Sequence, residues 1–455
     1  MRTGIIYAAL GALVMTPGVA SAKTNPQVAP AAPISLPYQS AGLPTAGQVQ
    51  AFYAGWRYAP IWFDGAVPNA AANSMISILQ RSSLDGIASG PQYAAQIQAA
   101  LQQAATGSPQ AIAFAEHSLS EALVLYAQMM DRPIPDMTYG YDYMKPTPPS
   151  AGEVLKIAAG APSLPAYLQQ VANPNSIYVS IRDTAWQQMQ AAGSTVPDPR
   201  VVANLERTRG MPAKGRFVLV NPATQMLTMY ENGVPVDSMR VVVGRKRDWN
   251  LPTPMITSTI FYAVHNPYWN SPDHLTRKNI ASLYLAQGDS YLKNRGYEVM
   301  SDWTTNATVI PPSEVDWKAV RAGKIHIRIR QKPGPENFMG EIKFPFANPQ
   351  DIFLHDVPEK DRFLFKQSQR TESNGCIRLE DAKRLGRWLL GHEPVPHNGD
   401  AEEFEQLSRG VPIYVTYITA KPENGQLTFV KDVYGWDPSG GTKVADSGAK
   451  GDDGR

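Results

Sequence analysis

Cys376 is the only cysteine among the 455 residues, and it lies in the stretch TESNGCIRLED. A thiol without an internal disulfide partner is either a buried, inert side chain or a reactive group. A nucleophilic thiol needs a base that takes its proton, donors that stabilise an oxyanion, and access for a substrate. The surrounding sequence offers candidates for each of these parts. We therefore favour the reactive interpretation.

His355 is the candidate base. It ends the strand-like stretch DIFLH and precedes Cys376 by a single loop. A strand end and the loop that follows it can bring two such side chains together. For His117, His392 and His397 we favour structural roles, in which the ring is held by hydrogen bonds.

The neighbours of the thiol suggest how the site is shaped. Gly375 suits a tight turn in which nearby backbone amides point at one oxygen. Asn374 could add a donor or cap the turn. Arg378 lies two residues beyond the thiol, and on a strand this spacing returns to the same face. It could bind a substrate carboxylate and favour the thiolate, or form a surface ion pair with Glu380 or Asp381.

Several classes of thiol protein are excluded by residue order and count. Papain-like proteases place the cysteine first and the histidine far downstream, whereas here the histidine comes first. A single cysteine cannot form a Cys-x-x-Cys pair, so dithiol redox chemistry and a thiolate metal site are excluded. Neither a P-loop nor a Gly-x-Ser-x-Gly motif occurs. We expect no metal and no cofactor.

Two regions of different periodicity must position these residues. Apolar residues recur at helical spacing from about residue 45 to 209. From about residue 215 to 420 the pattern changes to short alternating runs, with a hairpin signal at Glu231-Asn232-Gly233. The sequence therefore predicts an α+β chain in which a helical domain precedes a β-rich domain.

The two ends of the chain read differently. Residues 1–22 have one cation, a short apolar run and an Ala-Ser-Ala site, which is typical of a signal peptide cleaved after Ala22. Residues 23–44 are rich in Pro and Ala and indicate a linker, and residues 437–455 indicate a disordered tail. We expect an exported periplasmic protein without a transmembrane segment. The formal charge of +2 gives no reason to expect nucleic acid as a partner.

The segment from His355 to Leu379, HDVPEKDRFLFKQSQRTESNGCIRL, resembles the active-site segment of YkuD-type L,D-transpeptidases. In that family a His and a loop precede Ser/Thr-x-Gly-Cys-Ile/Val-Arg/Asn. The stretch NPYWNSPDHLTRKNI looks like the large, YcbB-like branch, which also has a helical scaffold ahead of the catalytic domain. The resemblance implies a scaffold domain at 45–209 and a catalytic domain at 215–420, with a lid at about 268–325.

The resemblance also implies roles for individual residues. Cys376 would be the nucleophile, His355 its base, and the amides of Gly375 and Cys376 the oxyanion hole. Asp356 could orient the imidazole, although in this family a backbone carbonyl often does so. The motif has His or Ser before the Gly where this chain has Asn374. The residues expected at the substrate are Ser373, Asn374, Arg378, Tyr268, Trp269 and Arg330, with packing as the alternative for Tyr268 and Trp269 and a solvated strand face for Arg330.

The implied reaction forms an acyl-enzyme on a peptidoglycan tetrapeptide stem, releases D-Ala and transfers the acyl group to an amine. A D,D-carboxypeptidase would be a possible partner, because it would supply the tetrapeptides. Two alternatives stay open. Water could replace the amine, which would make the protein an L,D-carboxypeptidase or a crosslink hydrolase. The chain could also be a non-catalytic wall-binding protein whose helical domain does the binding.

Overall fold

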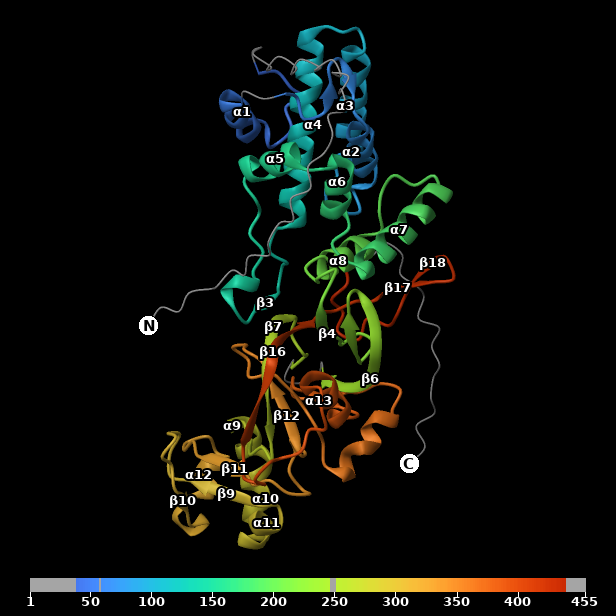
Figure 1. Ribbon diagram of the computed structural model, residues 1–455. Coiled ribbons are helices and arrows are strands. Elements are labelled where there is room, and N and C mark those ends of the chain that lie inside the picture. The colour runs from blue at the N-terminus through green and yellow to red at the C-terminus, as the bar shows by residue number, and fades with distance from the viewer. Residues whose placement is uncertain (1–37, 57–58, 246–250, 439–455) are drawn as a thin grey trace, which may run out of the picture.

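The computed structural model describes residues 38–56, 59–245 and 251–438. The predicted signal peptide, most of the linker and nearly all of the predicted tail lie outside these residues. Helices occupy one end of the molecule, a β-rich body the middle, and a small insertion the other end (Figure 1). The predicted α+β class, with the helical domain first, is confirmed.

Among the described residues, eight α-helices form the amino-terminal domain, and their apolar faces share one core. Side-chain caps fix several of their starts: Asn69 accepts from the amide of Ala71 at α2, and Ser150 and Glu153 form a capping box at α5. The helices are α1 (Ala46–Gly55), α2 (Ala70–Arg81), α3 (Gly90–Ala104), α4 (Pro109–Met130), α5 (Ala151–Gly160), α6 (Leu164–Ala172), α7 (Ser176–Ala191) and α8 (Pro199–Thr208).

The β-rich domain is built on a sheet that closes on itself. Its strands run in the order β12-β13-β15-β6-β5-β4-β16-β7, and β7 pairs back onto β12. The inward side chains fill a core of Val, Ile, Leu, Met and aromatic residues. The strands are β4 (Arg216–Asn221), β5 (Met226–Glu231), β6 (Val234–Gly244), β7 (Ile256–His265), β12 (Ile342–Pro345), β13 (Phe353–His355), β15 (Ile377–Leu379) and β16 (Glu403–Val415).

Helix α13 (Ala382–Leu390) packs on this core through Leu385 and Leu389. Asp381 caps its first turn with its side chain, and Gly391 ends it in the left-handed conformation that glycine adopts most easily. The helix follows β15 closely, so the strand that begins directly after Cys376 is anchored by a packed helix.

The two domains share secondary structure. Strand β3 (Thr138–Tyr139) comes from the loop between α4 and α5, yet it pairs with β7. At the other end of the chain, the hairpin β17 (Ala420–Glu423) and β18 (Gln426–Phe429) contacts α7. The loop between α4 and α5 thus adds a strand to the sheet of the β-rich domain.

The insertion between β7 and β12 has a sheet and a core of its own. Its four strands run in the order β10-β9-β11-β8, and Trp317, Val299 and Ile329 lie at the centre of its core. The sheet continues to Gln331, beyond the lid end expected at about residue 325. The elements are β8 (Trp269–Asn270), α9 (Asp273–Leu275), η2 (Thr276–Ile280), α10 (Ala281–Gln287), α11 (Asp289–Asn294), β9 (Tyr297–Met300), β10 (Val309–Ile310), α12 (Trp317–Arg321) and β11 (Arg328–Gln331).

Candidate active site

Strands β13 and β15 bring the histidine and the cysteine to one face of the sheet. They pair in parallel, with Leu354 opposite Ile377 and His355 opposite Arg378. Leu354 and Ile377 point into the core, so His355 and Arg378 point outward. Cys376 precedes Arg378 by two residues and shares that outer face. Strand spacing and rise place the Cα atoms of His355 and Cys376 about 8 Å apart.

A backbone carbonyl fixes the tautomer of His355. The Nδ1 of the ring lies 2.6 Å from the carbonyl oxygen of Asp356, and this oxygen can only accept. The proton therefore sits on Nδ1, which leaves the Nε2 lone pair free to take a proton. The Asp356 carboxylate is engaged elsewhere, since it accepts from the amide of Glu341 at 3.1 Å and pairs with Arg362 at 3.3 Å.

The imidazole is neutral at ordinary pH. Burial, followed by the nearby charges of Arg378 and Lys343, lowers the pKa of His355 to about 3, although the hydrogen bond to Asp356 acts in the opposite direction. Only 3% of the residue's surface is exposed. A neutral, buried imidazole can accept a proton from a thiol but does not hold one beforehand.

The thiol of Cys376 is free and partly exposed. Burial raises its pKa, while the Phe353 amide and the charge of Arg378 lower it and Asp351 raises it. The sulfur also donates a weak hydrogen bond to the Asp351 carbonyl, with 3.6 Å between Sγ and the oxygen. At rest the thiol is therefore protonated and the imidazole is neutral, and the two groups do not form a thiolate–imidazolium pair.

The turn before the thiol requires glycine. Gly375 has φ +114°, and a Cβ built on it would lie 2.8 Å from Cδ1 of Ile352. Its amide donates to Oγ of Ser373 at 3.2 Å, and the same hydroxyl donates to the Cys376 carbonyl at 2.5 Å. Ser373 is 2% exposed. The structure thus places Ser373 inside the turn, which it shapes, and turns the Gly375 amide toward that hydroxyl.

Asn374 and Arg378 lie close to the thiol but differ in their contacts. The side-chain carbonyl of Asn374 accepts from the Arg245 guanidinium at 3.3 Å, so this oxygen already has a partner within the protein. The ion pair considered for Arg378 is not what the structure shows. Glu380 pairs with Arg240 instead, and the Asp381 carboxylate caps α13. Burial lowers the pKa of Arg378, whose charge faces the same side as the thiol.

Tyr268, Trp269 and Arg330, which we expected at the substrate, make contacts within the insertion between β7 and β12. Trp269 packs against Phe338, with 4.8 Å between the ring centroids, and belongs to the edge of the lid core. Arg330 stacks over the ring of Tyr268 at 4.1 Å and forms an ion pair of 2.8 Å with Glu298. Packing explains Trp269, and the charge of Arg330 is already paired.

A family model described as the L,D-transpeptidase catalytic domain, YkuD, matches residues 215–415, and a model described as a scaffold domain matches residues 47–184. The chain therefore carries a YkuD L,D-transpeptidase catalytic domain behind a scaffold domain. The match covers every strand and turn that carries the site residues, from β4 through β15.

A Haemophilus influenzae protein provisionally named as an L,D-transpeptidase is 24% identical over 405 residues, which cover 85% of this chain and 77% of the relative. Two solved structures are more distant. An L,D-transpeptidase from Mycobacterium smegmatis has 12% identity and a TM-score of 0.21 over 44% of this chain and 58% of that one. The avibactam carbamoyl enzyme of Ldtfm has 11% identity and a TM-score of 0.21 over 44% of this chain and 49% of that one. At these scores the solved structures carry no weight in the assignment.

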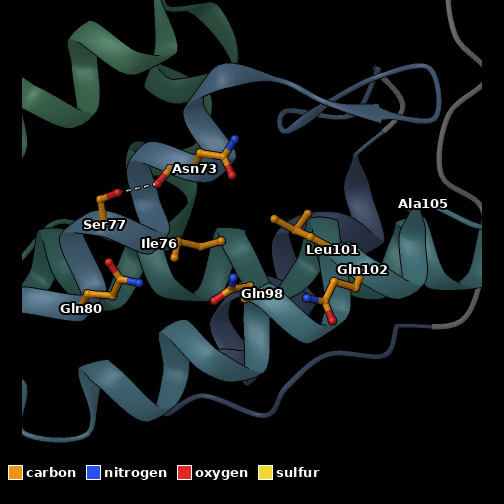
Figure 2. Close-up of a pocket in the computed structure, with 8 residues that line it drawn as sticks. All are labelled: Asn73, Ile76, Ser77, Gln80, Gln98, Leu101, Gln102 and Ala105. Atoms are coloured by element: carbon orange, nitrogen blue, oxygen red, sulfur yellow. Dashed lines mark hydrogen bonds between the residues drawn. The ribbon is translucent and has the colours of Figure 1, made fainter.

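Two cavities lie elsewhere on the described part of the protein. One of about 420 Å³ sits between α2 and α3 (Figure 2), and its lining is Asn73, Ile76, Ser77, Gln80, Gln98, Leu101, Gln102 and Ala105. The other, of about 540 Å³, lies between α8 and the segment around Pro254. No histidine or cysteine lines either one. In the described parts of the chain, no group of three acidic, His or Cys side chains could hold a metal ion. Neither cavity competes with the Cys376 site as a site of chemistry.

The turn Ser373–Cys376, called the nucleophile turn below, is supported on its buried side by residues that sequence reasoning missed. Thr253 donates to the Gly375 carbonyl, and Tyr434 bonds both to Thr253 and to Gly244. Thr253 stands between two prolines, a signal for an extended segment that cannot join a sheet and is free to bond elsewhere. Tyr434 lies beyond residue 420, the boundary expected for the catalytic domain.

Proposed function

We propose that the protein is an exported peptidoglycan L,D-transpeptidase in which Cys376 attacks a tetrapeptide stem and passes it to an amine. The observation that carries the proposal is the parallel register of β13 and β15. This register sets His355 opposite Arg378, with Cys376 directly before β15, in the part of the chain that matches the catalytic-domain model.

The first half-reaction begins from the neutral pair. As the thiol sulfur attacks the carbonyl carbon of the third stem residue, its proton passes to Nε2 of His355, and the carbonyl oxygen becomes an oxyanion. The protonated imidazole then donates to the nitrogen of the terminal D-Ala, and the carbon–nitrogen bond breaks. A thioester on Cys376 and free D-Ala are the products, with the histidine neutral again.

In the second half-reaction an amine of another stem attacks the thioester. His355 takes a proton from this amine, the carbon–sulfur bond breaks, and the thiolate recovers the proton from the imidazolium. The low pKa of His355 makes the imidazolium a strong acid, so the proton is returned readily at each stage. Because His355 returns every proton that it takes, the two half-reactions balance without a metal or a cofactor.

Charge around the site suits an anionic substrate. Arg378 lies on the face of the thiol, and Lys343 lies opposite His355 on β12. Arg245 bonds to Asn374 beside the nucleophile. Peptidoglycan stems carry carboxylates, and Arg378 and Arg245 form a local attraction for them, while Lys343 is engaged by Glu402 at 3.2 Å. We assign Arg378 to a stem carboxylate, and we keep Tyr268 and Arg330 as a lid surface that meets the same stem.

The proposal extends to place and partners. A protein that acts on peptidoglycan works outside the cytoplasm, and residues 1–22 would deliver it to the periplasm. Among the described residues, no helix combines the length and the apolar character that crossing a membrane requires. A D,D-carboxypeptidase would act upstream of it, since tetrapeptide donors arise when the last D-Ala is removed from pentapeptides.

The test uses mature protein, residues 23–455, with purified disaccharide-tetrapeptide, beside Cys376→Ala. We expect the wild type alone to form a dimer that lacks one D-Ala, detected by mass spectrometry of the products. Fragmentation of the dimer identifies the acceptor amine. Tripeptide without dimer would replace the transpeptidase with the carboxypeptidase or hydrolase alternative.

The wall-binding alternative has a separate test. Full-length Cys376→Ala is sedimented with isolated sacculi, and the bound fraction is compared with that of wild type. Absence of any product or thiol adduct in the wild type, together with equal binding of both proteins, would favour a non-catalytic wall-binding protein and overturn the enzyme proposal.

A further inference from the structure

Thr253 contacts the nucleophile turn from its buried side. The side chain is fully buried, and its Oγ donates to the carbonyl oxygen of Gly375 at 2.7 Å. The hydroxyl oxygen of Thr253 also accepts from the amide of Gly244, at the end of β6, at 2.8 Å. One hydroxyl thus uses its donor and one acceptor position to join the turn to the end of a core strand.

The hydrogen bond from Thr253 to the Gly375 carbonyl also fixes the direction of the Cys376 amide. The carbonyl of Gly375 and the amide of Cys376 belong to one planar peptide unit, and in a trans unit they point in opposite directions. A carbonyl held inward by Thr253 therefore turns the Cys376 N–H outward. Since the Gly375 amide is turned to Ser373, the Cys376 amide is the donor that this peptide unit offers to an oxyanion beside the sulfur.

Thr253 is itself held in place from two directions. Tyr434 is fully buried, and its hydroxyl donates to the Gly244 carbonyl at 2.7 Å and accepts from the Thr253 amide at 3.3 Å. Gly244 admits this arrangement because it lacks a side chain: a Cβ there would lie 2.6 Å from the Thr253 nitrogen and 2.2 Å from the Leu251 carbonyl oxygen.

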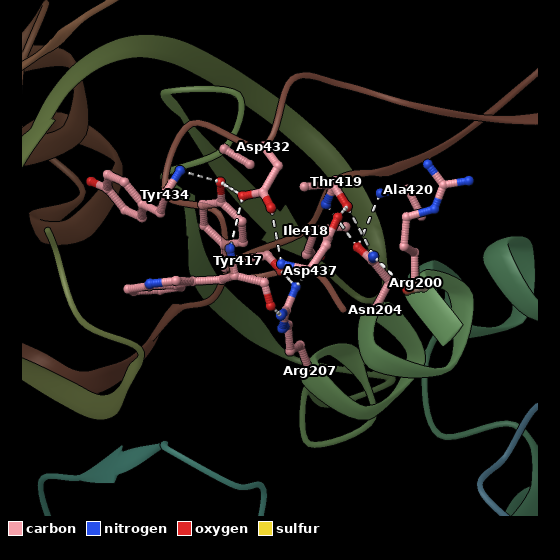
Figure 3. Close-up of polar contacts among 12 residues, drawn as sticks. Arg200, Asn204, Arg207, Tyr417, Ile418, Thr419, Ala420, Asp432, Tyr434 and Asp437 are labelled. Atoms are coloured by element: carbon pink, nitrogen blue, oxygen red, sulfur yellow. Dashed lines mark hydrogen bonds and ion pairs between the residues drawn. The ribbon is translucent and has the colours of Figure 1, made fainter. Parts of the chain in front are cut away.

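Polar contacts extend this support to the helical domain (Figure 3). The Tyr434 amide donates to the hydroxyl of Tyr417 at 2.9 Å, and that hydroxyl donates to Asp432 at 2.6 Å. Close by, Arg207 of α8 forms an ion pair of 2.7 Å with Asp437. The segment that carries Tyr434 is thereby anchored on both domains.

We propose that Thr253 is a positioning residue that aims the Cys376 amide at the oxyanion, and that Tyr434 holds Thr253 in register. The inference deepens the proposed function, because it presumes acyl transfer through a tetrahedral intermediate at Cys376. It assigns Thr253 and Tyr434 a part in the chemistry, although both side chains are fully buried.

The test compares two reactions of the same thiol. Iodoacetamide alkylates sulfur by direct displacement and forms no oxyanion, whereas p-nitrophenyl acetate acylates it through a tetrahedral oxyanion. Thr253→Val keeps the side-chain shape and loses the donor. We expect its acylation rate to fall about 100-fold, on the scale of a lost oxyanion donor, with alkylation within about twofold of wild type. Thr253→Ser retains the hydroxyl and should recover most of the acylation rate.

A merely structural role would give a different pattern. Equal losses in both reactions, or no loss of acylation in Thr253→Val at an unchanged melting temperature, would overturn the proposal. Tyr434→Phe is a second variant should Thr253→Val fail to fold. It keeps the ring and should reduce acylation about tenfold while leaving alkylation unchanged, and unchanged acylation would again overturn the proposal.

The same experiment separates this inference from the proposed function. Acetylation by the ester needs no peptidoglycan, so it reports on the turn whether or not the protein forms dimers from disaccharide-tetrapeptide. Selective loss of acylation without any muropeptide product would retain the positioning role and refute the transpeptidase. With the natural substrate, Thr253→Val should lower kcat and leave KM unchanged, because the stem contacts are untouched.

Discussion

His355 lies directly opposite Arg378 in the parallel pairing of β13 and β15, so a neutral base and a permanent cation share one patch of the sheet with Cys376. The cation contributes to the low pKa of the histidine and acts in favour of the thiolate. Burial nevertheless dominates both groups and keeps each of them neutral. The site is therefore arranged to move a proton during attack rather than to store a thiolate.

This arrangement predicts the pH dependence of alkylation. Because the pKa of Cys376 is raised above its usual value of 9.0, less than about 1% of the thiol is ionised at pH 7. We expect the rate with iodoacetamide to rise about tenfold per pH unit from pH 6 to pH 8.5. Mass spectrometry of quenched samples measures the rate, with glutathione as the reference thiol. A plateau below pH 7 would instead indicate a preformed ion pair.

The buried histidine also predicts a loss of stability in acid. Its pKa is about 3 in the folded protein and 6.5 in the reference state, so the unfolded chain binds the proton first as pH falls. Its contribution to stability is present above pH 6.5 and is lost as pH falls toward 3. Between pH 7 and pH 5 we expect the free energy of unfolding to decrease by about 2 kcal/mol from this group.

Urea denaturation of wild type and His355→Gln at both pH values measures this contribution. The glutamine does not titrate, so the difference in unfolding free energy between the two proteins should shift by that amount in favour of the variant at pH 5. An equal change in both proteins would show that other groups cause the acid sensitivity.

Some of this architecture follows from the sequence and some does not. Helix α13 and the β15 segment carry strong local signals, namely the Asp381 cap, apolar spacing and the unusual Gly-Cys pair. The partner of the histidine ring could not be settled, because a backbone carbonyl leaves no mark on residue identity. The hydrogen bond from Tyr434 to Gly244 joins residues 190 positions apart in the sequence, and no local pattern predicts such a contact.

For the lid residues, too, the sequence shows the residue types but not their contacts. An aromatic residue and a cation, such as Tyr268 and Arg330, do not reveal from the sequence whether they face a substrate or one another. The pairing of Arg330 with Glu298 is set by the register of β11 and β9, which sequence alone does not fix.

Gly375 predicts a test of the turn. Gly375→Ala should lower the free energy of unfolding by about 1–3 kcal/mol, because alanine is strained at φ +114°. The close approach to Ile352 involves only the end of a flexible side chain, so it adds less. Gly375→Ala with Ile352→Val should therefore recover little of the loss, as measured by urea denaturation. Full recovery would mean that the contact, and not the backbone, demands glycine.

The ion pair between Arg207 and Asp437 predicts coupling between the two domains. The two side chains are 10% and 7% exposed, and Arg207 also donates to the carbonyls of Tyr417 and Trp436. Removing one charge leaves the other buried and unpaired, so Arg207→Gln should lower the free energy of unfolding by about 3–5 kcal/mol.

A double-mutant cycle with Asp437→Asn separates the pair from its surroundings. Arg207→Gln with Asp437→Asn should be less destabilised than the sum of the single variants, because no charge is then left alone. Arg132→Gln is the matched control. Arg132 pairs with Glu206, which lies on α8 beside Arg207, but the Arg132 side chain is 31% exposed, so its loss should lower the free energy of unfolding by less. Since the same segment anchors Tyr434, Arg207→Gln should also slow acylation of Cys376 by p-nitrophenyl acetate more than Arg132→Gln does. Equal acylation rates in these two variants would show that the domain junction and the nucleophile turn are independent.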